Sequence, residues 1–284
     1  MSGGTDLNGR VVVVTGGTRG VGAGIVDAFA RTGARVVVCA RRPPKAPLPG
    51  CEFVPVDLRD ADAVREMFAR LDRVDVLVNN AGGTPYRRLD EADARRHARV
   101  LELNLTAPLT ASLAAREQLA AAGGSVVMIG SVSGTRPSPG SAAYGAAKAG
   151  LENLARSMAV EWAPHIRVNT LVLGMVRTEL AALHYGDEDG VAAVGATVPI
   201  GRLAEPHEVG EAAVFLASDA ASYITGASLL VHGGGEAPAF LAAATVNKDD
   251  KTSNVHDGGT PTPRPGRPGR PTRPTRPTRA SKGE

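Results

Sequence analysis

The chain has little cysteine, no long apolar run and no clustered histidines. Only two of its 284 residues are cysteines, Cys39 and Cys51, too few for a disulfide scaffold and without metal-ligand spacing. No uninterrupted apolar run approaches the length of a bilayer-spanning helix. Residues 1–6 show neither the basic start nor the apolar stretch of a secretory signal. We therefore expect a protein of the cytoplasm with no metal site and no membrane contact.

Positive charge is concentrated at the C-terminal end. Residues 248–284 hold nine Lys or Arg against four acids, a net charge of +5, so that the other residues carry −2 of the total of +3. Within this tract, residues 262–279 are dominated by Pro, Arg, Thr and Gly, which cannot bury enough apolar surface to offset the entropy of ordering. We predict a disordered basic tail over residues 247–284 after a single domain over residues 1–246. An acidic partner for the tail, such as nucleic acid, is an alternative to plain solvation.

Short branched apolar runs alternate with longer Ala-rich amphipathic stretches from residue 10 to about residue 232. This alternation is typical of an α/β domain with a parallel sheet covered by helices on both faces. The sequence predicts a Rossmann-like, doubly wound, seven-stranded sheet. The expected strands are 11–14, 35–39, 53–56, 74–78, 125–129, 167–172 and 228–231, and the expected helices are 21–32, 60–71, 92–122 with a break near Pro108, 141–162 and 206–217.

Two connections depart from this regular alternation. Four prolines lie between residues 41 and 52 and exclude a helix there, so an extended loop should join the second and third strands. Residues 178–203 read as one irregular segment rich in Gly and Ala. Because a connection of this length in a compact domain is usually functional, we predict a lid.

A glycine-rich loop follows the first predicted strand. Gly16, Gly20 and Gly22 lie where the chain turns from that strand into the first helix. Backbone amides at such a turn can hold a pyrophosphate. A tight turn without a ligand is the alternative, but the position at the first crossover of an α/β pattern favours the phosphate site.

The second strand ends at Arg41 and Arg42, where a site for NAD would place an acidic residue to accept from the ribose. Arg41, with Arg19 from the glycine loop, can instead clamp a 2′-phosphate through charge-assisted hydrogen bonds. We therefore favour NADP(H) over NAD(H), with arginines that are merely solvated at a strand end as the alternative.

Tyr144 and Lys148 are four residues apart in a predicted helix, which sets a phenol beside an ammonium. A phenol close to a fixed positive charge has a lowered pKa and can exchange a proton near neutral pH. Ser131 lies thirteen residues upstream of the tyrosine. An amphipathic helix face and a turn serine are the structural alternatives to a proton-transfer site.

Thr15 to Gly22, Asn79-Asn80-Ala81-Gly82 and Ser131 followed by Tyr144-x-x-x-Lys148 occur in this order. In these motifs the chain resembles the short-chain dehydrogenase/reductase family over about residues 7–236. It is similar both to 3-oxoacyl-thioester reductases and to broad carbonyl reductases of that family. One departure is Leu173-Gly174, where the family usually has Pro-Gly.

The resemblance implies roles for individual residues. Tyr144 would be the proton donor, Ser131 would orient the substrate oxygen, and Asn104 would support a water that relays protons to Lys148. Asp57 would meet the adenine and Thr178 the nicotinamide carboxamide. The implied catalytic set is Asn104, Ser131, Tyr144 and Lys148, and the cofactor site, with the arginines above, is Gly16, Thr18, Arg19, Gly20, Val21, Arg41, Asp57, Leu58, Asn80, Ala81, Gly82, Tyr144, Lys148, Gly174, Val176 and Thr178.

The predicted function is an NADP(H)-dependent oxidoreductase that moves a hydride between nicotinamide and a ketone or secondary alcohol. The alternatives are an NAD-dependent alcohol dehydrogenase of the same family and a catalytically silent, cofactor-sensing scaffold. An apolar pocket bordered by Tyr86, Val132, Met175, Leu183 and Tyr185 would suit a small or medium hydrophobic substrate. The resemblance also implies a homotetramer or dimer with the helices at 107–122 and 141–162 at its interface.

Overall fold

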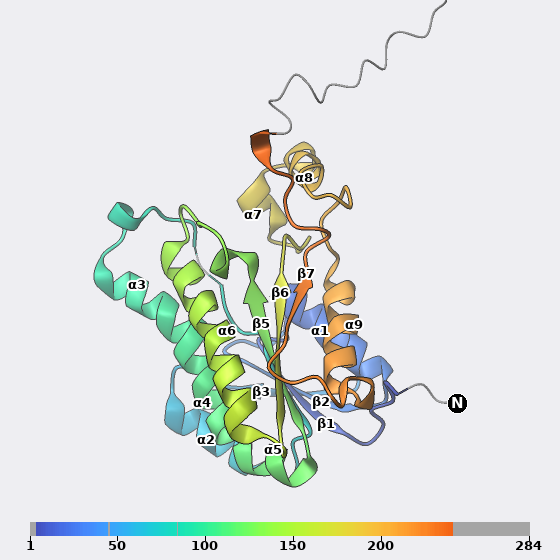
Figure 1. Cartoon of the computed structure of the whole chain (residues 1–284). Helices are drawn as coiled ribbons and strands as arrows, with labels where there is room; N and C mark the ends of the chain where they lie inside the picture. Colours follow the sequence, from blue (N-terminus) through green and yellow to red (C-terminus); the bar gives the residue numbers. More distant parts are fainter. Residues whose placement is uncertain (1–3, 45, 84, 241–284) are drawn as a thin grey trace, which may run out of the picture. The chain divides into compact units, whose positions relative to one another are not determined.

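A computed structural model describes residues 4–44, 46–83 and 85–240. Seven parallel strands form one sheet in the order β3-β2-β1-β4-β5-β6-β7 (Figure 1). The order reverses between β1 and β4, which makes the carboxyl ends of these two strands the topological switch point where α/β folds bind ligands. The strands are β1 (Val11–Thr15), β2 (Arg35–Ala40), β3 (Cys51–Pro55), β4 (Val76–Asn79), β5 (Ser125–Ser131), β6 (Arg167–Leu173) and β7 (Ser228–Val231).

Helices cover both faces of the sheet (Figure 1). The α-helices are α1 (Gly20–Arg31), α2 (Ala61–Ala69), α3 (Ala94–Leu101), α4 (Ala107–Ala114), α5 (Arg116–Ala122), α6 (Ala142–Trp162), α7 (Ala181–Tyr185), α8 (Glu188–Gly195) and α9 (Pro206–Ala217). Single turns lie at η1 (Leu89–Glu91), η3 (Val132–Gly134) and η4 (Asp219–Ala221), and a π-helical turn, η2, spans Glu102–Thr106.

Alternation along the strands supplies two hydrophobic cores. Val11 and Val13 of β1 face one core, which also receives residues from α2, α4 and α6. Val12 and Val14 face the other, which is closed by α1 and α9. Because both faces of the central strands are buried, these strands consist of near-continuous Val and Leu rather than of alternating polar residues. The predicted fold class is confirmed.

The predicted strands are found with ends that shift by up to two residues, as for β3 and β4. The described residues between β2 and β3 form no helix, as the prolines predict. The expected irregular segment at 178–203 is wrong, because it contains α7 and α8. Asp187 caps α8 by accepting from the Gly190 amide at 3.0 Å, and two acids follow in the first turn, so a helix-start signal was present in the sequence.

The long helix predicted over 92–122 is also wrong in detail. In the structure the first helix of this region begins at Ala94 and continues into the π-helical turn η2, and a second interruption lies at Ala115, between α4 and α5. Pro108 explains the π-helical turn, since it has no amide to donate to the carbonyl of Asn104 four residues earlier. The Ala107 amide bonds instead to the Glu102 carbonyl, five residues back.

The described residues up to Pro238 form one compact unit, and a second unit begins at Ala239. The predicted tail at 247–284 lies outside the described residues, so the proposed boundary at residue 246 stays a prediction. Among the described residues, no helix is long and apolar enough to cross a bilayer.

Candidate active site

The glycine loop between β1 and α1 is built for close approach. Gly16 has a φ of +66°, and a Cβ there would lie 2.9 Å from the Ala81 Cα. At Gly22 a Cβ would lie 2.5 Å from the Asn80 Nδ2 and closer still to the Gly16 carbonyl oxygen. Neither position tolerates a side chain, because the loop packs directly against the segment after β4.

The first turn of α1 leaves its amides available. The N-cap residue Arg19 makes no side-chain capping bond, and the first turn holds no acidic residue. Free amides at the N-terminus of a helix attract anions through hydrogen bonding and the helix dipole. The glycine loop and this helix start therefore fit a pyrophosphate group, at the place where the sequence predicted one.

The segment after β4 braces this loop. Thr15 Oγ1 accepts from the amides of Asn80 and Ala81, each at 3.0 Å. Asn80 Nδ2 donates to the carbonyls of Thr15 at 2.9 Å and Gly16 at 3.1 Å. These bonds fix the carboxyl ends of β1 and β4 together at the switch point, and the predicted residues Asn80 and Ala81 meet Gly16 there.

The proton-transfer residues gather one strand further along. Ser131 ends β5, and Tyr144 and Lys148 lie one turn apart on α6. Lys148 Nζ lies 5.4 Å from the centre of the Tyr144 ring and donates to the Ile129 carbonyl of β5 at 2.7 Å. The predicted juxtaposition of phenol and ammonium is therefore present in the fold, and it is held by a hydrogen bond to the strand that carries Ser131.

Burial governs the acidity of both side chains. It raises the pKa of the Tyr144 phenol, against the lowering by a hydrogen bond with Ser131, and it lowers the pKa of Lys148 to about 8. The sequence predicted that Lys148 lowers the pKa of the phenol, but in this structure Lys148 has no such effect. The protein groups leave Tyr144 protonated at neutral pH, which is the form that donates a proton.

Asn104 lies in the π-helical turn with its side chain fully engaged. Its Oδ1 accepts from the Gly83 amide at 2.9 Å, and its Nδ2 donates to the carbonyls of Gly83 and Val100 at 3.0 and 2.9 Å. A Cβ at Gly82 would lie 2.6 Å from the Asn104 Oδ1 and 3.5 Å from the Lys148 Nζ. Asn104 and Lys148 thus flank the same glycine.

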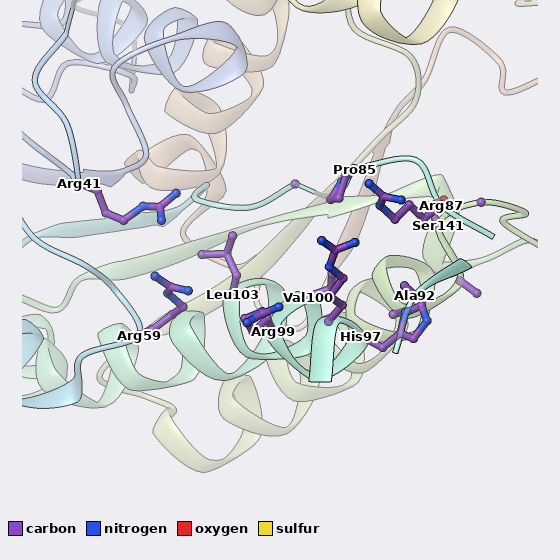
Figure 2. A pocket seen from close by; sticks show the side chains of 15 residues that line it. Arg41, Arg59, Pro85, Arg87, Ala92, His97, Arg99, Val100, Leu103 and Ser141 are labelled. Carbon is purple, nitrogen blue, oxygen red and sulfur yellow. The ribbon is translucent and has the colours of Figure 1, made fainter. Parts of the chain in front are cut away.

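A cavity of about 360 Å³ reaches Ala142 and Ala143, the residues directly before Tyr144, although its lining does not include Ser131, Tyr144 or Lys148. Figure 2 shows Arg41 and Arg59 at one end and Arg87 with Ser141 at the other, with Val100 and Leu103 between them. Gly83 and the first residues of α6 also line it. The basic residues of the lining are Arg41, Arg59, Arg87, Arg96, His97 and Arg99.

Arg59 was missed in the sequence. It forms a two-bonded pair with Asp57, at 3.0 and 2.6 Å, which lowers the pKa of that carboxyl to about 2. Since β3 lies beside β2, the ends of both strands meet, and Arg59 joins Arg41 along the same cavity. The Asp57-Leu58-Arg59 run directly after a strand was the signal that could have found it. Arg19 is exposed at the start of α1 and does not line the cavity.

The remaining predicted cofactor residues lie around the same edge of the sheet. Thr178 approaches the start of α1, since a Cβ at Gly20 would lie 3.4 Å from its Cγ2, and both line a second cavity of about 800 Å³. Val176 bridges to Ala204. Gly174 packs so closely against His232 that a Cβ would lie 2.8 Å from that residue's Cβ. Thr18 and Val21 are half-buried near the glycine loop, and Leu58 is buried.

The residues expected to border an apolar pocket are dispersed. Met175 and Tyr185 pack onto a small cluster with Ala181, Val191 and Leu203. Leu183 is exposed, Val132 is half-buried, and Tyr86 lies over Gly140. None of the five lines either of the two cavities described above. The expectation of an apolar pocket with few charged groups therefore does not describe the cavity beside Tyr144.

Comparisons with known proteins agree with this geometry. The family model described as enoyl-(acyl carrier protein) reductase matches residues 16–236. The cis-4-hydroxycyclohexanecarboxylate dehydrogenase of Sinomonas cyclohexanicum is 40% identical over 240 residues, 79% of this chain and 96% of that protein. The ligand-free aldohexose dehydrogenase of Thermoplasma acidophilum superposes with a TM-score of 0.78 at 30% identity, covering 82% of this chain and 96% of the other.

RhlG of Pseudomonas aeruginosa, solved as an NADP active-site complex, superposes with a TM-score of 0.75 at 30% identity, and the match covers 82% of this chain and 99% of that one. The matches span both the glycine loop and the Tyr144-Lys148 helix. The chain therefore belongs to the short-chain dehydrogenase/reductase family and is an oxidoreductase that acts on CH–OH groups with a nicotinamide cofactor.

Proposed function

We propose that the chain is an NADP(H)-dependent oxidoreductase that interconverts a ketone and a secondary alcohol, with Tyr144 as its general acid and base. The observation that carries this proposal is the meeting of Ser131, Tyr144 and Lys148 at the carboxyl end of β5, beside a glycine loop that fits a pyrophosphate. A silent scaffold would not need a buried lysine next to a half-buried tyrosine, because burying an ammonium without a carboxylate lowers stability.

When bound, the nicotinamide cofactor supplies or accepts the hydride. The protein has to supply a proton to the carbonyl oxygen and a hydrogen bond that steadies its developing charge. Tyr144 donates that proton and Ser131 donates the hydrogen bond. Lys148 holds positive charge beside the phenolate that remains and returns a proton to it, and a water on the Asn104 carbonyl then replaces the proton that Lys148 has given up.

The preference for NADP(H) rests on the charges after β2 and β3. Arg41 forms no ion pair with a described residue, whereas Arg59 shares its charge with Asp57. An unpaired guanidinium next to a paired one suits a 2′-phosphate, and a ribose hydroxyl would leave Arg41 without a partner. The structural similarity to the NADP complex of RhlG is in keeping with this choice.

Ring-sized secondary alcohols are the substrates we propose. The similar proteins include a dehydrogenase of a hydroxycyclohexanecarboxylate and a dehydrogenase of aldohexoses. Both are rings that carry secondary hydroxyl groups. Homo-oligomer formation and a cytoplasmic location stay predictions of the sequence.

The decisive test is the Tyr144→Phe variant, assayed with cyclohexanone and a panel of ring ketones by following NADPH oxidation. Removing a general acid should lower kcat by about 10²–10⁴-fold. Binding of NADPH, measured by calorimetry, should weaken far less than kcat, because the contacts of the glycine loop with the phosphates stay in place. A matched control is Tyr86→Phe, at an exposed position outside the cluster. Full activity of Tyr144→Phe would overturn the proposal.

A further inference from the structure

The cavity beside Tyr144 carries far more positive charge than its cofactor end needs. Arg41 and Arg59 lie at the end nearest β2 and β3, while Arg87 lies with Ser141 at the opposite end (Figure 2). Arg96, His97 and Arg99 of α3 add to the same lining. A 2′-phosphate at the first end would use Arg41 and Arg59, and His97 Nε2 is paired with the Leu89 carbonyl at 3.2 Å, which leaves Arg87, Arg96 and Arg99 without an assigned partner.

Acidic residues lie nearby but are engaged elsewhere. Glu91 accepts from the Arg88 amide at 3.0 Å and Asp93 from the Arg96 amide at 2.8 Å, so both carboxylates cap helix starts. Among the described residues, Arg87, Arg96 and Arg99 form no ion pair. Several like charges around one concave space repel one another, and the repulsion is relieved when an anion enters.

The backbone adds to this attraction at the Arg87 end. Ser141, Ala142 and Ala143 line the cavity, and Ala142 begins α6, a helix of 21 residues. Its N-cap residue Ser141 makes no side-chain capping bond, because its hydroxyl is paired with that of Ser138 at 2.7 Å. The uncapped start of a long helix therefore points its partial positive charge at the same space as the arginines.

The wall at this end of the cavity is held by a backbone hydrogen bond, and Tyr144 follows its last lining residue in the chain. The Arg87 amide donates to the Gly140 carbonyl at 2.7 Å, which ties the loop after β4 to the loop before α6. Tyr144 is the third residue of α6, directly after Ala142 and Ala143 of the lining. Tyr144 itself is not part of the lining, but a molecule whose anionic group lies at the start of α6 is bound one helical residue away from it.

We infer that this cavity, through Arg87 with Arg96 of the same lining, binds a carboxylate of the substrate, so that the enzyme acts on anionic ring alcohols and ketones. The inference rests on the proposed function, since it names the substrate of the same site. A space of about 360 Å³ suits a small molecule and not a nucleic acid. A carboxylate also matches the planar fork of a guanidinium and the amides of a helix start.

The first arm of the test measures binding without turnover. Cyclohexanecarboxylate and the neutral cyclohexanecarboxamide have the same shape, and neither has a hydroxyl to oxidise. Calorimetry with the full chain at low salt should show the carboxylate binding at least about tenfold more tightly. Arg87→Gln and Arg96→Gln should each remove most of that difference.

Matched controls lie one residue away from each variant. Arg88→Gln and Arg95→Gln remove exposed arginines that do not line the cavity, and both should leave the carboxylate preference unchanged. Equal binding of the two compounds, no binding of the carboxylate at millimolar concentration, or equal losses in the control variants would each overturn the inference.

The second arm compares turnover of 4-hydroxycyclohexanecarboxylate and cyclohexanol. The wild-type protein should favour the carboxylate in kcat/KM, and Arg87→Gln should raise KM for it by about tenfold and change KM for cyclohexanol far less. Arginine-dependent binding without oxidation of any alcohol contradicts the proposed function alone. Oxidation of cyclohexanol with no carboxylate preference contradicts only the inference.

Discussion

The proton-transfer cluster and the basic cavity lie side by side but are stabilised in different ways. In the cluster, Lys148 is buried and held by a 2.7 Å hydrogen bond to β5, with Tyr144 beside it. In the cavity, Arg41, Arg87 and Arg96 are exposed and come from separate segments. A buried charge in the cluster interacts strongly with its neighbours and lowers the stability of the fold, whereas each exposed charge of the cavity is screened by solvent and interacts weakly. The cluster should therefore control rate, and the cavity should control which molecules bind.

After the loss of activity in Tyr144→Phe, the largest effect should come from Lys148→Met, which removes the charge of the cluster. We expect kcat to fall by about 10²–10³-fold, because the phenolate loses its positive neighbour. The same variant should be more stable at pH 7. Burial lowers the pKa of Lys148 from 10.5 to about 8, so keeping the ammonium charged inside the fold costs about 3 kcal/mol at pH values below 8.

The sign of the pH dependence provides the check. As the pH rises from about 8, the folded protein loses this proton first and the penalty shrinks, and it disappears above about pH 10.5, where the unfolded chain is neutral too. Urea unfolding of wild type and Lys148→Met should therefore differ at pH 7 and converge at high pH. Tyr144→Phe is the matched control, since it removes activity without removing this charge. A variant that is inactive and less stable at pH 7 would contradict this account.

A smaller effect is expected at the cofactor end of the cavity. Arg41→Ala should raise KM for NADPH by about 10–100-fold, the value of one charge-assisted contact, and leave KM for NADH unchanged. Arg59→Ala should have a weaker effect because Asp57 already shares its charge. Arg42 is exposed and does not line the cavity, so Arg42→Ala is the control. An equal rise in KM for NADPH and for NADH after Arg41→Ala would contradict the proposal that Arg41 binds the 2′-phosphate.

The two regions also differ in what the sequence reveals. Tyr144 and Lys148 were predictable because helical spacing places them together whatever else the fold does. Arg59 was not, since its proximity to Arg41 depends on β3 pairing with β2. Arg96 and Arg99 lie on α3, whose sequence is that of an ordinary solvated helix, and only the tertiary structure turns that face toward a cavity.

The fold follows the same division. The seven strands were predictable because short runs of Val and Leu between amphipathic helices are typical of strands in a parallel sheet that is buried on both faces. The turn at Glu102–Thr106 was not predicted, although Pro108 indicated a break, because a missing amide does not specify whether the helix kinks or widens. The helices α7 and α8, of five and eight residues, are too short to show a helical period, and only α8 has a side-chain cap, at Asp187, that indicates its start.

The smallest effect, and the one that compares both regions in a single experiment, is that of salt. Raising KCl from about 0.05 M to about 0.5 M shortens the screening length from about 14 Å to about 4 Å. Exposed arginines should lose much of their attraction, so KM for NADPH and for an anionic ring alcohol should rise several-fold. The buried contacts of Lys148 and Tyr144 are screened far less, so kcat should stay constant, and KM for a neutral alcohol should not change. Steady-state kinetics over this range of KCl would measure kcat and KM for both alcohols. A fall in kcat as large as the rise in KM would show that salt acts on the cluster as strongly as on the cavity.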